Sequence, residues 1–162
     1  MVGHNRHSKN LRKHRYSASG HIYLVTTTCI ARNPIFENTM LGGIVVNEIR
    51  QSDEARRTYT FAYVVMPDHL HWLFQLQQSA SLSSIVQRVK GRSANQINKL
   101  RNLSGPVWQP GYHDRTLRID ESLERIGNYI VANPVRGGIV KSIEDYPLWD
   151  LMWRRRWAEI RG

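Results

Sequence analysis

A strand–turn–strand pattern over residues 58–76 constrains the fold of this chain more than any other segment. Its two halves are rich in β-branched and aromatic residues, and Pro67-Asp68 between them favours a turn, so an antiparallel hairpin is predicted. The second half begins His69-Leu70-His71. Because successive strand side chains point to opposite faces, both histidines should share a face while Leu70 enters the core. Taken alone, this pattern fits two surface histidines as well as half of a divalent-metal site.

Further segments complete a predicted β-α-β-β-α-β-α order. Strands are expected within residues 20–29 and 107–118, and helices over residues 38–52, 81–100 and 120–133. The candidate N-caps of the last two helices are Ser81, Ser83 and Asp120. The helices should lie on one face of an antiparallel sheet of about four strands, which is a ferredoxin-like α+β arrangement.

The length of 162 residues fits one domain with a core of its own. We place that domain at residues 20–150, between a flexible basic arm over residues 1–19 and a basic tail over residues 151–162. Cys29 is the only cysteine, so no internal disulfide can form, which fits a reducing compartment. No apolar run approaches the ~20 residues that span a bilayer, and the N-terminus lacks the apolar core of a signal peptide. A cytoplasmic protein without membrane association is the expectation.

The formal net charge of +10 at pH 7 points to a polyanionic partner. Residues 1–36 contain no acid and residues 81–119 contain only Asp114, whereas acids gather at 48–54 and 120–124. Such segregation favours a nucleic-acid footprint over a generally basic surface. The candidate DNA-binding residues are Arg6, Lys9, Arg12, Lys13, Arg15, Arg88, Lys90, Arg92, Lys99, Arg101, Arg115 and Arg118. For the last two, ion pairs with the acids at 120–124 are the alternative.

Three aromatic residues are candidates for stacking on unpaired bases: Trp72, Trp108 and Tyr112. Trp72 follows His71 on the predicted strand, so alternation directs it into the core. For Trp108 and Tyr112, packing in the core and stacking on bases are equally good interpretations.

A second candidate cluster lies on the last predicted helix. Tyr129 and Asn133 are four residues apart, so they share a helix face. A phenol can act as a covalent nucleophile, and an amide oxygen is an acceptable ligand for Mg²⁺ or Mn²⁺. The alternatives are a half-buried aromatic for Tyr129 and a C-terminal cap before Pro134 for Asn133.

Three blocks in this order carry a family resemblance: residues 63–71 (YVVMPDHLH), residues 108–115 (WQPGYHDR) and residues 129–140 (YIVANPVRGGIV). Together they resemble the REP-associated tyrosine transposases, which belong to the HUH single-tyrosine nucleases. In the name HUH, U is an apolar residue, and Leu70 takes that place between His69 and His71. The resemblance runs from about residue 18 to residue 150.

The resemblance implies a ferredoxin-like nuclease that cuts single-stranded DNA beside palindromic hairpins. It also implies His69 and His71 as metal ligands and Tyr129 as nucleophile, forming a 5′-phosphotyrosine link. Asn133 stands where related transposases have glutamine, so it is the implied third ligand through a side chain one methylene shorter. Mg²⁺ or Mn²⁺ is the expected metal, with zinc as the alternative; His113 is a possible further ligand. The expected assembly is a monomer or a homodimer.

Two other functions are compatible with the sequence. The same fold can bind structured DNA or RNA without cutting it, and the charge pattern supports this as well as it supports a nuclease. The His-x-His and Tyr-x-x-x-Asn sets favour the enzyme, because binding alone has no use for them. A metal-dependent hydrolase of small phosphoesters is the third interpretation, and the basic segments argue against it.

Overall fold

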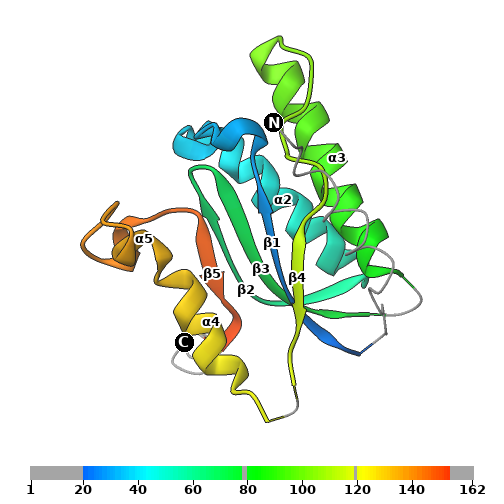
Figure 1. Ribbon diagram of the computed structural model, residues 1–162, viewed down its shortest axis with the longest axis vertical. Coiled ribbons are helices and arrows are strands. Elements are labelled where there is room, and N and C mark those ends of the chain that lie inside the picture. The colour runs from blue at the N-terminus through cyan, green and yellow to red at the C-terminus, as the bar shows by residue number, and fades with distance from the viewer. Residues whose placement is uncertain (1–19, 78–79, 119, 154–162) are drawn as a thin grey trace, which may run out of the picture.

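The predicted hairpin is the centre of the observed sheet (Figure 1). The computed structural model describes residues 20–77, 80–118 and 120–153. Strand β2 (Thr58–Met66) turns at Pro67 and Asp68 into β3 (His69–Leu76), and both strands have the predicted bounds.

The other strands extend the sheet on both sides, in the order β4-β1-β3-β2-β5, with every neighbouring pair antiparallel. β1 (Ile22–Thr28) pairs with β3, and β4 (His113–Thr116) forms the edge beyond it. On the opposite edge, β5 (Trp149–Leu151) pairs with β2. The α+β class with an antiparallel sheet is therefore confirmed, and the sheet has five strands where about four were expected.

The fifth strand lies after residue 138, in a part of the chain for which the sequence pattern predicts no helix or strand. It has three residues, too few for alternation to be visible in the sequence. The boundary predicted at residue 150 falls inside this strand, and Met152 and Trp153 pack on the small core beyond it. The folded part of the chain therefore runs past that boundary.

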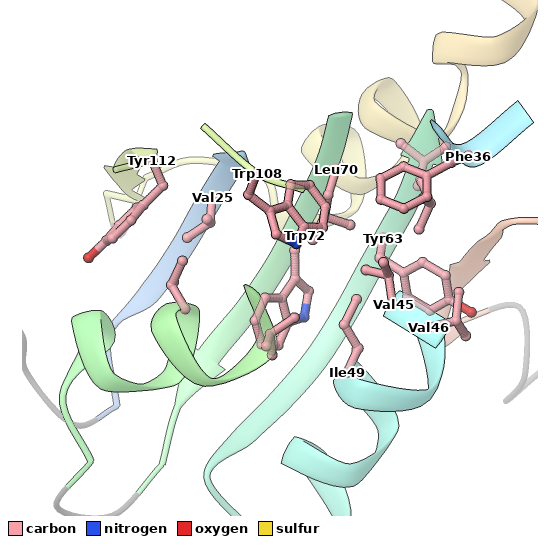
Figure 2. Close-up of a cluster of buried hydrophobic side chains, with 14 of the residues drawn as sticks. Val25, Phe36, Val45, Val46, Ile49, Tyr63, Leu70, Trp72, Trp108 and Tyr112 are labelled. Carbon is pink, nitrogen blue, oxygen red and sulfur yellow. The ribbon is translucent and has the colours of Figure 1, made fainter. Parts of the chain in front are cut away.

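Helices α2 (Thr39–Glu54) and α3 (Leu82–Arg101) cover one face of the sheet. Figure 2 shows this main core, in which Val25 and Trp72 of the sheet belong to one cluster with Val45 and Ile49 of α2. In the described residues, short 3-10 turns connect the longer elements: η1 (Ile30–Arg32), η2 (Ile35–Glu37) and η3 (Ile143–Asp145).

Helix α4 (Leu123–Val131) packs on the opposite face, and the short α5 (Asn133–Arg136) follows it (Figure 1). Ile130 and Val131 of α4 form a second, smaller core with Phe61 and Leu73 of the sheet. The expectation of helices on one face only was therefore wrong. The physical reason is visible in β3, where Trp72, Leu73 and Phe74 are all buried, so both faces of that strand need a cover. No helix in the described parts of the chain is long and apolar enough to cross a membrane.

The helix N-caps follow local hydrogen bonding. Ser81 is confirmed as the cap of α3, because its side chain accepts a hydrogen bond from the Ser84 amide at 3.1 Å. The predicted cap Asp120 was wrong: α4 begins later, and Ser122 accepts from the Arg125 amide at 3.2 Å. A serine at either position satisfies an amide that the helix leaves without a partner.

The aromatic candidates for base stacking are core residues. Trp72 points away from His71, as expected, and its indole nitrogen donates to Thr60 Oγ1 at 2.9 Å. Trp108 is buried against Phe36 and donates to Ser93 Oγ at 3.0 Å (Figure 2). Tyr112 is buried too, with its hydroxyl 3.0 Å from Ser83 Oγ. Their rings therefore serve packing.

Cys29 is fully buried, and burial together with the charge of Asp68 raises the pKa of its thiol to about 12. In the unfolded chain the pKa of this thiol is about 8.5. The free energy of unfolding therefore keeps its full value below that pH and falls as the pH rises from there toward the folded pKa. At pH 9 the folded chain should react with Ellman's reagent at least about a hundredfold more slowly than the urea-unfolded chain. Absorbance of the released thiolate measures both rates, and equal rates would contradict the burial.

Because Gly127 has no side chain, the indole of Trp153 can lie against α4. A Cβ atom at Gly127 would lie 2.4 Å from Cη2 of that indole, so Gly127→Ala should displace it and lower the free energy of unfolding by about 1–3 kcal/mol. Nothing lies within 4 Å of the corresponding Cβ position at Gly91 on α3. Gly91→Ala should therefore raise the free energy of unfolding by up to about 1 kcal/mol. Urea denaturation compares the two variants, and a stabilised Gly127→Ala protein would refute the contact.

Candidate active site

Strand β3 presents His69 and His71 on the face that α4 covers. Their side chains alternate with Leu70, which is buried in the main core, as the sequence predicted. The two imidazole rings are nearly perpendicular, at 83°, and their Nε2 atoms are 3.2 Å apart. Two nitrogens therefore converge on one point from neighbouring positions of a central strand.

The other nitrogen of each ring is held by a hydrogen bond. His69 Nδ1 donates to Asp68 Oδ1 at 2.6 Å, and Arg32 donates to the second oxygen of that carboxylate at 3.2 Å. His71 Nδ1 is 2.8 Å from Thr26 Oγ1, because the register of β1 on β3 places Thr26 opposite His71. When His71 Nδ1 donates to Thr26, both Nε2 lone pairs face each other, an arrangement that a shared cation stabilises.

The protonation of these groups favours ligation. Burial, and after it the charges of His69 and Arg136, lowers the pKa of His71 to about 4, so its imidazole is neutral at physiological pH. Burial acts to raise the pKa of Asp68, but the hydrogen bonds and charges of His69 and Arg32 outweigh it and the pKa is lowered. A carboxylate behind one ring and a neutral second ring are the usual state of metal-binding histidines.

The separation of the Nε2 atoms fits a common cation. Two nitrogens each 2.0–2.1 Å from one ion, at octahedral or tetrahedral angles, are roughly 2.8–3.4 Å apart. The observed 3.2 Å falls in this interval. Among the described residues, no group of three or more His, Cys, Asp or Glu side chains is placed to hold a metal, His113 included.

A groove of about 840 Å³ runs along α4 and brings the two predicted clusters together. It is lined by His71 of β3, Tyr129 of α4 and Asn133, the first residue of α5. Tyr129 is 65% exposed, so its hydroxyl is not buried in hydrocarbon. Asn133 donates through Nδ2 to Ile130 O at 2.6 Å, so Oδ1 is the atom of this amide that is left to accept a bond or ligate a cation. The structure thus places the imidazole of His71, the phenol and the amide around one space, with His69 beside His71.

Arginines gather on the walls of the same groove: Arg115, Arg118, Arg125 and Arg136. Arg115 of β4 pairs with Glu121, and Glu121 also accepts from the Arg118 amide at 2.7 Å. These hydrogen bonds, followed by the charges of both arginines, lower the pKa of Glu121. Arg118 lies 3.7 Å from Asp120. Arg115 and Arg118 therefore make the ion pairs of the alternative interpretation, and both also line the groove. Their contact with DNA stays a prediction.

The basic residues of α3 lie on the other face of the sheet, away from this groove. Lys90 donates to Gln109 O at 2.8 Å and to Gly111 O, and Arg92 pairs with buried Glu48 at 2.9 Å. These two side chains therefore make contacts that stabilise the fold, although Arg92 is itself exposed. Three other basic residues on α3 are exposed as well: Arg88, Lys99 and Arg101. The candidates of the N-terminal arm lie outside the described residues: Arg6, Lys9, Arg12, Lys13 and Arg15.

Several residues of this site were not predicted from the sequence. Thr26 became a partner of His71 only through strand register, which no local pattern shows. Asp68 stands next to His69 in the sequence, and this adjacency was the available signal. Arg125 and Arg136 line the groove because of their places on α4 and α5.

Comparisons with known proteins show which sequences and structures this chain resembles. The family model described as "Transposase IS200 like" matches residues 17–133. A Haemophilus influenzae protein named as a REP-associated tyrosine transposase is 30% identical over 116 residues, covering 63% of this chain and 66% of the relative. An Escherichia coli REP-associated tyrosine transposase is 30% identical over 87 residues, covering 53% and 50%. The chain thus matches about half to two thirds of the length of these curated relatives. A solved REP-associated tyrosine transposase bound to a REP hairpin has a TM-score of 0.68 and 25% identity, covering 83% of this chain and 79% of that one.

Proposed function

Because the chain belongs to the family of IS200-like transposases, we propose that it is a metal-dependent single-tyrosine DNA endonuclease and strand transferase. One observation carries the proposal: His71, Tyr129 and Asn133 come from three different elements and line one groove. A purely structural role explains the paired, anchored imidazoles less well than ligation does.

The proposed substrate is single-stranded DNA that carries a palindromic hairpin of the REP type. The solved neighbour is described as bound to a REP hairpin, and two curated relatives carry the REP-associated name. Four groove arginines supply positive charge for the phosphates of the strand that enters. Three exposed basic residues of α3, Arg88, Lys99 and Arg101, and the basic N-terminal arm are proposed contacts to the rest of the DNA.

His69, His71 and Asn133 are the proposed ligands of a Mg²⁺ or Mn²⁺ ion. A bound ion would polarise the scissile phosphate and take up charge that develops in the transition state. Two imidazoles and an amide carry no net negative charge, so phosphate oxygens must supply it and binding should be weak without DNA. Asp68 and Thr26 hold the two rings so that both Nε2 lone pairs are available.

Tyr129 is the proposed nucleophile. Its hydroxyl oxygen would attack the phosphorus in line, forming the Tyr129–phosphorus bond while the bond from phosphorus to the 3′ oxygen breaks. The phenol loses one proton and the departing 3′ oxygen gains one, so the step balances without a cofactor as reactant. The 5′-phosphotyrosine ester keeps the energy of the broken bond, and a different 3′-hydroxyl can reverse the step to join strands.

A doubly labelled oligonucleotide tests the proposal. Single-stranded DNA with a REP-type hairpin carries one dye at its 5′ end and another at its 3′ end and is incubated with the protein and Mn²⁺. On a denaturing gel, the 3′ dye should move with the protein and the 5′ dye should appear on a shorter free strand. Two free fragments would mean that water is the nucleophile. Binding without cleavage would favour a non-catalytic module that binds structured DNA or RNA.

A further inference from the structure

Arg136 makes two contacts with Tyr129 that none of the other groove arginines is seen to make. Its guanidinium carbon lies 3.9 Å from the centroid of the phenol ring, so the charged plane stacks on the ring face. Its Nη1 also donates to the backbone oxygen of Tyr129 at 2.7 Å. Arg136 therefore contacts both the side chain and the main chain of Tyr129, the proposed nucleophile.

The chain between the two residues fixes this arrangement. α4 ends at Val131, and α5 begins at Asn133 with buried Pro134 in its first turn. The Gly137 amide then donates to Asn133 O at 2.8 Å, which closes α5 directly after Arg136. Because this turn is short and internally bonded, Arg136 is directed back toward the last turn of α4.

An exposed phenol needs such a contact to hold one direction. Tyr129 is the most exposed aromatic residue recorded in the described parts of the chain, so few neighbours limit its rotation. Fixing a side chain beforehand removes an ordering cost from the reaction. We propose that Arg136 is the positioning residue of Tyr129, an inference that rests on the proposed function of this groove.

The chemistry of the guanidinium explains why arginine stands here. It is planar and carries several donors, so it stacks with its face and donates with its edge at the same time. A lysine ammonium is a point charge that cannot do both in this geometry. Arg136→Lys therefore keeps the charge of the groove while it loses the two-point hold on the tyrosine.

Kinetics of covalent adduct formation separate positioning from charge. Arg136→Gln and Arg136→Lys should both lower the rate at saturating DNA by about tenfold, with a smaller change in the half-saturating DNA concentration for the lysine variant. The matched control is Arg118→Gln, which removes one charge from the same groove but no contact to Tyr129 and should act mainly on the half-saturating concentration. If Arg136→Lys reacts at the wild-type rate, only the charge matters and the proposal fails.

A second readout needs neither DNA nor metal. In protein labelled with 3-fluorotyrosine, the ¹⁹F resonance of Tyr129 is identified by its loss in Tyr129→Phe. Arg136→Gln and Arg136→Lys should shift and narrow that resonance, and Arg118→Gln should leave it in place. An unmoved resonance in both Arg136 variants would overturn the inference. If the wild-type protein forms no adduct, the proposed function is refuted. The ¹⁹F measurement would still show whether Arg136 contacts the ring of Tyr129.

Discussion

Replacing Tyr129 with phenylalanine should abolish the covalent protein–DNA adduct and lower cleavage of hairpin DNA by at least about a thousandfold. The variant keeps the aromatic ring on which Arg136 stacks and removes only the attacking oxygen. Because the ring is largely exposed, the free energy of unfolding and the affinity for DNA should stay close to those of the wild type. The denaturing gel with two end labels measures adduct and cleavage together.

The control for this variant is Tyr59→Phe. Tyr59 is also an exposed tyrosine, on β2, and it does not line the groove. Its phenylalanine variant should form adduct at the wild-type rate. Cleavage that persists in Tyr129→Phe would show that another group or water attacks the phosphorus, and the assignment of the nucleophile would then be wrong.

Replacing His71 with alanine should lower the affinity for Mn²⁺ by at least about a hundredfold, which is the second largest effect we expect. This affinity is measured in the presence of a hairpin DNA that cannot be cleaved. The change removes one of two converging nitrogens and leaves Thr26 without its partner across the strands. Electron paramagnetic resonance of free Mn²⁺ gives the bound fraction directly, without reference to activity. Adduct formation should fall in parallel.

The matched control is His21→Ala. His21 is exposed just before β1 and does not line the groove, so its loss should change neither Mn²⁺ binding nor adduct formation. Unchanged Mn²⁺ affinity in His71→Ala would show that the cation binds elsewhere. Loss of affinity in both variants would point to an effect of general charge.

Local patterns predicted the parts of the fold that depend on a few neighbouring residues. The hairpin of β2 and β3 was predicted to its bounds, because alternation and a Pro67-Asp68 turn are properties of adjacent positions. The last helix was predicted within a few residues, but its cap shifted from Asp120 to Ser122. β5 and the second helical layer were not predicted, because they depend on pairing and burial between distant segments.

The same distinction applies to the site. His69, His71, Tyr129 and Asn133 were visible as residue types at a meaningful spacing, and the structure brings three of them to one groove, with His69 beside His71. The contact of Thr26 with His71 and the stacking of Arg136 on Tyr129 arise only after the chain has folded. On α3, Lys90 and Arg92 resembled their exposed neighbours in sequence, yet their partners lie about twenty and forty residues away.

The two halves of the groove are anchored with unequal strength. The histidines belong to the central strand of the sheet, bonded on both edges and backed by the large core, whereas Tyr129 and Asn133 depend on a nine-residue helix and the small core beneath it. We therefore expect local opening to release α4 before it disturbs β3. A nucleic-acid strand that enters the groove would then move Tyr129 together with α4, while the two histidines keep their places in the sheet.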